Sequence, residues 1–206
     1  LMSSPTKVPA NMTSGVVKDT DKASKTASFG SSANSGKVIQ LDTSGLIPSN
    51  LLNPVADQFR LNADQAITAS EVDLTAWERV DTAGQGTTTS QLTQSSGIFS
   101  FPSTGLYLVM FHASIGRTSA NVDIIDLRLR GSTDNFTGNN LLVESSAGIT
   151  GSTPSEIAPL VTLINVTNTA NDKLKITVEA DATGTSLRGS SATNKTYITF
   201  LRITGT

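Results

Sequence analysis

The densest hydrophobic pattern of the chain lies between residues 97 and 115, with the sequence GIFSFPSTGLYLVMFHASI. Apolar residues on both sides of Pro-Ser-Thr-Gly predict two strands joined by a tight turn. In the second strand, alternate side chains project to opposite faces of a sheet. One face carries Tyr107, Val109, Phe111 and Ile115, and the other carries Leu106, Leu108, Met110 and His112. Since both faces are apolar, we expect an opposing sheet to cover one and a neighbouring subunit to cover the other.

Shorter alternating segments lie on both sides of this hairpin and predict further strands. In the segment 123–130, for example, Ile125, Leu127 and Leu129 are expected to face inward. No segment shows a convincing helical period. Many short strands separated by turn signals predict an all-β sandwich or jelly roll. The other expected strands are 59–63, 71–80, 141–143, 160–166, 173–179 and 197–203, with polar turns or loops at 81–91, 131–140, 167–172 and 183–195.

The chain before this region has a different composition and is expected to form two further parts. Residues 1–36 are low in complexity, with sparse apolar residues, and predict an extended arm that orders only against partner subunits or an assembly, the alternative being a disordered arm. Residues 37–56 predict a collar or linker with a short strand, a turn and an apolar hook. Residues 57–206 are then the head. The apolar residues expected to anchor the arm and collar are Val38, Leu41, Ile47, Leu51 and Leu52.

Charge and composition narrow the classes of function. Charged residues make up 16% of the chain, against roughly 25% in ordinary globular proteins. The formal net charge is −2 and no run of Lys or Arg occurs, which argues against nucleic-acid binding. The chain has no cysteine, so disulfides and thiolate metal sites are excluded. No apolar run has the length needed to cross a bilayer, so no membrane insertion is expected.

The chemistry of an enzyme is not evident in the sequence. The single histidine, His112, lies in the most apolar strand and is interpreted as a core or interface residue. Carboxylates occur singly rather than in pairs suited to acid and base catalysis. We therefore expect no catalytic residues, no metal and no cofactor. A glycosidase pair assembled from distant loops remains the enzymatic alternative.

Two stretches resemble known families. Residues 36–52 contain, in this order, GKV, the pattern LD.SG.IP, in which a dot stands for any residue, and LL. This succession resembles a short module in the shafts and collars of bacteriophage fibre proteins. There it precedes a trimeric head. Residues 57–206 resemble the C1q/TNF-like jelly roll, through an opening strand with Phe59, the 97–112 hairpin, and a closing strand with Tyr197, Phe200 and Leu201.

The second resemblance implies a compact homotrimer with both termini near one end. It would explain why the strand after Gly105 is apolar on both faces. No cluster of calcium ligands is evident in the sequence, so a metal at the trimer axis is not expected. The residues expected at the trimer interface or in the core are Tyr107, Leu108, Val109, Met110, Phe111, His112 and Phe200.

Loops on a jelly-roll scaffold can carry recognition, because the scaffold fixes them without constraining their sequence. The loop 131–140 contains Asp134, Asn135 and Phe136, which offer the carboxylate, amide and aromatic face that a glycan site uses. Arg117 and Arg188 lie in other loops and would add hydrogen-bond donors. The alternative interpretation is that all five are solvated turn residues.

Together these patterns predict a non-enzymatic, homotrimeric fibre, knob or decoration protein of a bacteriophage particle. Its arm would bind other virion proteins, and its head would attach to glycans or proteins of the host surface. Such a protein is assembled in the host cytoplasm and lies on the virion surface. The alternatives are a bacterial or spore-surface C1q-like adhesin, a carbohydrate-binding module, and a carbohydrate-active enzyme.

Overall fold

The computed structural model describes residues 12–13, 16–17, 55–88, 91–117, 123–138, 140–149, 155–181 and 184–204. The chain divides into two units, Leu1–Pro54 and Val55–Thr206. In the first unit, β1 (Met12–Thr13) pairs antiparallel with β2 (Val16–Val17). The collar residues Val38, Leu41, Ile47, Leu51 and Leu52 lie outside the described residues, as does the strand expected at 37–41.

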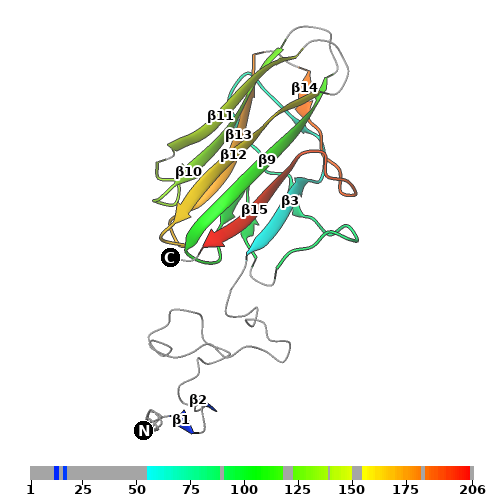
Figure 1. Cartoon of the computed structure of the whole chain (residues 1–206). Helices are drawn as coiled ribbons and strands as arrows, with labels where there is room; N and C mark the ends of the chain where they lie inside the picture. The colour runs from blue at the N-terminus through cyan, green and yellow to red at the C-terminus, as the bar shows by residue number, and fades with distance from the viewer. Residues whose placement is uncertain are drawn as a thin grey trace, which may run out of the picture. The chain divides into compact units, whose positions relative to one another are not determined.

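The second unit is a sandwich of two antiparallel sheets (Figure 1). The first sheet, which we call the β9 sheet, has the order β4-β14-β9-β15-β3-β6, with β12 also paired to β9. The second, the β10 sheet, has the order β11-β10-β13-β8-β7, with β5 also paired to β13. The strands of the β9 sheet are β3 (Ala56–Leu61), β4 (Gln65–Ala66), β6 (Trp77–Arg79), β9 (Gly105–Arg117), β12 (Ser155–Val166), β14 (Thr185–Leu187) and β15 (Tyr197–Thr204). Those of the β10 sheet are β5 (Val72–Asp73), β7 (Thr93–Ser95), β8 (Ile98–Ser100), β10 (Asp123–Ser132), β11 (Asn140–Ile149) and β13 (Lys173–Ala180).

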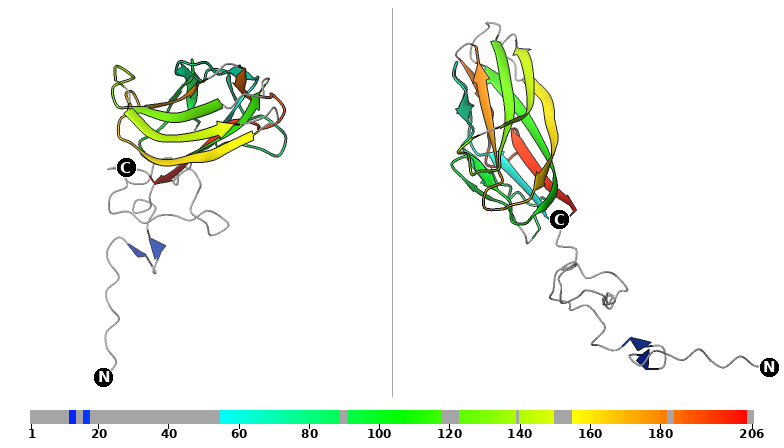
Figure 2. Two further views of the ribbon diagram at one scale, coloured as in Figure 1. Left: turned by 90° about the horizontal axis from the view of Figure 1, so that it is seen from above. Right: turned by 90° about the vertical axis from the view of Figure 1, so that its left-hand side faces the viewer.

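The core lies between the two sheets, which face each other in the views of Figure 2. Alternate residues of β9, Tyr107, Val109 and Phe111, are almost fully buried there, as the period of two predicts. Aromatic rings fill the centre: Phe99 of β8 lies 5.2 Å from Phe59 and 5.2 Å from Phe200, measured between ring centroids. Such ring contacts add to the burial of apolar area that stabilises a sandwich.

A two-residue turn at Ser96 and Gly97 joins β7 to β8, with Ser95 paired to Ile98. Both turn residues have positive φ, 49° and 85°, as the turns that suit twisted hairpins require. A side chain at Gly97 would also place its Cβ 2.4 Å from the carbonyl oxygen of Leu74. Only glycine satisfies both conditions at this position.

The strand directions define two ends of the head. At one end, the amide of Arg202 donates to the carbonyl of Val55, so the first residue of the head lies beside its last strand. Gly105 pairs with Val166 at that end. At the opposite end, Arg117 of β9 pairs with Thr185 of β14. We call these the entry end and the far end.

Several strands differ from the sequence expectation. β11 and β12 are longer than the segments 141–143 and 160–166. Residues 144–149 of β11 also pair with β10, and residues 155–157 of β12 also pair with β9, beyond a register shift. β14 lies inside the expected loop 183–195 and is held between β4 and β9. Only two short strands, β5 and β6, form within the expected strand 71–80.

Candidate functional site

The outer face of the β9 sheet is apolar at its entry half. Directly paired residues of neighbouring strands project to one face, and Leu163, Leu108 and Leu201 form one such row across β12, β9 and β15. The next row is Val161 and Met110. We call the set Leu108, Met110, Val161, Leu163, Leu201 and Ile203 the apolar face.

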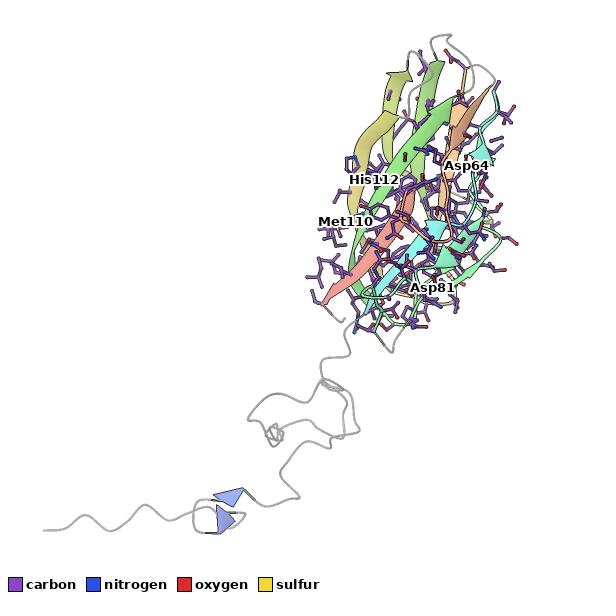
Figure 3. All side chains as sticks on the ribbon, turned by 90° about the vertical axis from the view of Figure 1, so that its right-hand side faces the viewer. Asp64, Asp81, Met110 and His112 are labelled. Carbon is purple, nitrogen blue, oxygen red and sulfur yellow. The ribbon has the colours of Figure 1, made fainter. Side chains whose placement is uncertain are left out.

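The apolar face meets solvent in the single chain. Val161 is 52% exposed, Leu163 56% and Ile203 56%, whereas Leu108 and Met110 are half-buried between their neighbours. Figure 3 shows Met110 on the same side of the head as His112. Exposed apolar side chains that adjoin one another in this way mark a contact surface, whereas single ones do not.

Toward the far end the outer face of the β9 sheet becomes polar. The rings of His112 and Tyr197 lie 5.1 Å apart, and Tyr197 pairs with Arg60. Arg60 is fully buried and its guanidinium is held by Glu78 at 2.7 Å and Asp81 at 2.6 Å. These ion pairs satisfy a charge that would otherwise be costly to bury.

A pocket of about 190 Å³ opens at the entry end, beside the edge strands β11 and β12. Leu142, Leu163 and Ile164 form its apolar lining, and its polar lining includes Asn165, Asp172 and Lys173. The carboxylate of Asp172 is already engaged, because it accepts hydrogen bonds from the amides of the turn at 167–168.

The outer face of the β10 sheet has the opposite character and centres on Arg128. Its guanidinium lies 2.5 Å from Glu144, 2.9 Å from Glu179, 2.9 Å from Asp126 and 3.7 Å from Glu71. Burial lowers the pKa of Arg128, but the hydrogen bonds and charges of these carboxylates outweigh that effect and raise it. Arg128 therefore joins β10, β11, β13 and the residue before β5 through charge.

A second charged group lies beside it. Arg130 binds Glu71 with two hydrogen bonds, and Lys175 lies 2.9 Å from Asp73. The hydrogen bond from Arg130 lowers the pKa of Glu71 from 4.5 to about 2, against the opposing effect of burial. These four side chains line a hollow of about 380 Å³, which we call the polar hollow.

The five loop residues expected to bind a ligand do not converge. Asp134, Asn135 and Phe136 follow β10 at the entry end, whereas Arg117 and Arg188 lie at the far end. Within one head, Arg117 and Arg188 therefore do not lie beside the 131–140 loop, because β10 runs back toward the entry end. The carboxylate of Asp134 accepts hydrogen bonds from Ser132 and from the amide of Gly138, and the bond from Ser132 is the main cause of its lowered pKa.

The residues expected at the core or interface divide into two groups. Four of them, Tyr107, Val109, Phe111 and Phe200, are core residues with at most 1% exposure. The other three, Leu108, Met110 and His112, lie on the outer face. Sequence reasoning did not assign Val161, Leu163 or Ile203 to this face. The sequence of residues 160–166, LVTLINV, did indicate this for Val161 and Leu163. It has apolar residues at both odd and even positions, and therefore on both faces of a strand.

Two features are absent from the residues that the structure describes. These residues contain no group of three or more His, Asp or Glu side chains placed to hold a metal ion. They also contain no helix with the length and apolarity needed to span a membrane.

Comparisons with known proteins identify the fold. The head is similar to the solved structure of Eiger TNF from S. frugiperda, with a TM-score of 0.55 and 15% identity, over 75% of this chain and 96% of that one. It is also similar to murine APRIL at pH 5.0, with a TM-score of 0.51 and 10% identity, over 73% of this chain and 100% of that one. No protein-family model and no curated protein matches the sequence. The chain therefore has a TNF-like, all-β jelly-roll fold, as the strand order predicted. The expectation that residues 97–115 form a hairpin is wrong, because β8 belongs to the β10 sheet and β9 to the β9 sheet, so the Pro102 turn crosses between the two sheets.

Proposed function

We propose that this protein is a non-enzymatic structural protein of a bacteriophage particle, a homotrimeric fibre or knob whose head attaches to the host surface. The observation that carries the proposal is the apolar face. A surface of this kind needs a cover, and the C1q/TNF-like resemblance of the sequence implies that the cover is another copy of the head.

The geometry of the head suits a closed ring. The protruding side chains Leu201 and Ile203 lie at one edge of the apolar face, and the pocket beside β11 and β12 lies at the other. Leu163, which lines the pocket, and Leu201 are both paired to Leu108. The pocket and the protruding side chain therefore lie at the same level along the strands. Copies related by rotation about an axis roughly parallel to the strands can then meet without a shift along it, which is the condition for a ring rather than a filament.

The bacteriophage assignment is supported by the N-terminal sequence. The words GKV, LD.SG.IP and LL in residues 36–52 resemble a fibre collar module, and residues 1–36 have the composition of an arm that binds only within an assembly. The predicted partners are therefore other copies of the chain, virion proteins at the arm, and glycans or proteins of the host at the head. The predicted location is the virion surface, after assembly in the host cytoplasm.

The first test is the mass of the full chain by light scattering on a sizing column. The chain has a mass of 21.5 kDa, so a trimer has about three times that value. A mass of three chains that holds on dilution supports the assembly, and a monomer contradicts it. Antibody labelling of purified particles then tests the location, because a bacterial-surface adhesin would label cells and not particles.

A further inference from the structure

The polar hollow lies on the outer face of the β10 sheet, opposite in the sandwich to the apolar face. Arg130 and Lys175 are direct partners across β10 and β13, so two cations stand side by side. Like charges in this position repel each other. Glu71 and Asp73 compensate them, one carboxylate for each cation. The hollow therefore holds two positive and two negative groups and has no net charge.

An aromatic ring stands beside the hollow in a fixed position. The Nζ atom of Lys175 lies 5.1 Å from the centroid of the Phe136 ring. Phe136 and Asn135 both have positive φ, 62° and 58°, which is uncommon for any residue other than glycine and most unusual for a bulky one. The surrounding contacts hold them there: the amide of Phe136 donates to Ser132, and the amide of Asn135 donates to the carbonyl of Asn171. Such local strain is often retained at binding sites.

These groups have the chemistry that recognises a sugar. Carboxylates accept hydrogen bonds from hydroxyl groups, and ammonium and guanidinium groups donate to them. The partly exposed ring of Phe136 beside the hollow offers an apolar surface to the C–H groups of a sugar ring. A volume of about 380 Å³ lies within the roughly 300–1,000 Å³ typical of ligand pockets.

The balance of positive and negative groups in the hollow favours neutral sugars over anionic ones. An anionic sugar would need a cation without a carboxylate partner, whereas Arg130 and Lys175 each have one. A neutral sugar carries no such requirement, and its hydroxyl groups can bridge neighbouring donors and acceptors.

We infer that the polar hollow, with Phe136 at its rim, binds one or two rings of a neutral saccharide. This inference rests on the proposed role in host attachment and names the class of ligand. It assigns recognition to the side of the head, on the sheet that the ring assembly leaves uncovered.

The test uses the full chain and free saccharides, measured by saturation-transfer NMR and titration calorimetry. The panel is glucose, galactose, mannose and N-acetylglucosamine with their common disaccharides, and glucuronic and sialic acids represent the anionic class. We expect at least one neutral saccharide to bind saturably. Failure of every neutral saccharide, or tighter binding of an anionic one, would overturn the inference.

Two variants locate the site independently. Asp73→Asn removes one carboxylate charge with little change of shape, and Phe136→Leu removes the aromatic surface while keeping an apolar side chain. Each should weaken binding at least about tenfold. The matched control is Glu144→Gln, on the same sheet face but outside the hollow. Melting temperature and solution mass are measured for all three, and unchanged affinity in both hollow variants would place the site elsewhere.

Adsorption of particles to host cells separates this inference from the proposed function. If particles carrying Asp73→Asn or Phe136→Leu adsorb normally, the hollow is not the attachment site, although attachment by the head still stands. If particles that lack the head adsorb normally, the proposed attachment role itself is wrong, whatever the saccharide data.

Discussion

On the outer face of the β10 sheet, Arg128, Arg130 and Lys175 each have carboxylate partners within the same chain. On the outer face of the β9 sheet, by contrast, Val161 and Leu163 are more than half exposed. Both faces belong to one sandwich and lie over one core. The charges of the first face are balanced within a single chain, whereas the apolar side chains of the second have no cover within it. The two sheets of one sandwich can thus display outer faces that differ in whether their side chains are paired within the chain.

The largest expected effect comes from a charge on the apolar face. Met110→Glu should convert the trimer to a monomer, because burying an unpaired carboxylate at the subunit contact costs several kcal/mol. Light scattering measures the change, and circular dichroism checks that the head remains folded. Met110→Leu, which keeps an apolar side chain of similar volume, should leave the mass at three chains. A folded Met110→Glu protein with the wild-type mass would show that this face is not the contact.

The next largest effect should come from removing the cation at the centre of the other face. Arg128→Met leaves four carboxylates without their shared partner, and we expect a loss of about 2 kcal/mol in the free energy of unfolding. Urea unfolding measures the loss, which should shrink in 1 M salt because the carboxylate repulsion is screened. The solution mass should stay unchanged. A change of mass would contradict the assignment of this face to intrachain contacts.

A smaller effect should appear as pH dependence. In the folded chain the pKa of Glu71 is about 2, below its ordinary value of 4.5. Its contribution to stability is therefore complete above pH 4.5 and is lost as the pH falls through about 2. Because the side chain is partly exposed, we expect about 1 kcal/mol. Urea midpoints between pH 4.5 and 2 should fall less steeply in Glu71→Gln than in the wild type. Equal slopes would show that the Arg130 contact adds nothing to stability.

The smallest effect on stability should come from a single exposed carboxylate beside Arg128, on the outer face of the β10 sheet. Glu144→Gln removes one of the more exposed partners of Arg128 and should cost less than about 0.5 kcal/mol. Urea unfolding at low and high salt measures it. A loss as large as that of Arg128→Met would mean that this single pair, rather than the whole group of carboxylates, holds the sheet face together.

The sequence predicted those parts of the fold that depend on local periodicity. The two faces of β9 follow from alternation, and the core positions of β10 follow in the same way. The far halves of β11 and β12 escaped prediction because Ser, Gly and Pro have low strand propensity, and only pairing with β10 and β9 makes these segments strands.

Placement of the candidate sites was harder, since it depends on the direction of each strand. The order of the strands along the chain was enough to place the loop after β10 at the entry end. β9 runs from the Pro102 turn at the entry end to the far end, and β10 runs back to the entry end. The polar hollow could not be read from the chain in the same way. Glu71 and Asp73 are far from Arg130 and Lys175 in sequence, and only the pairing of β5 with β13 brings them together.

The hydrogen bond between Arg202 and Val55 has a consequence for how such a head is used. A domain whose first and last residues are neighbours can be inserted into, or exchanged between, unrelated carrier chains with little disturbance of either partner. The jelly roll of this protein is therefore a portable module. Such a jelly roll can change carriers by recombination at two adjacent points of the fold.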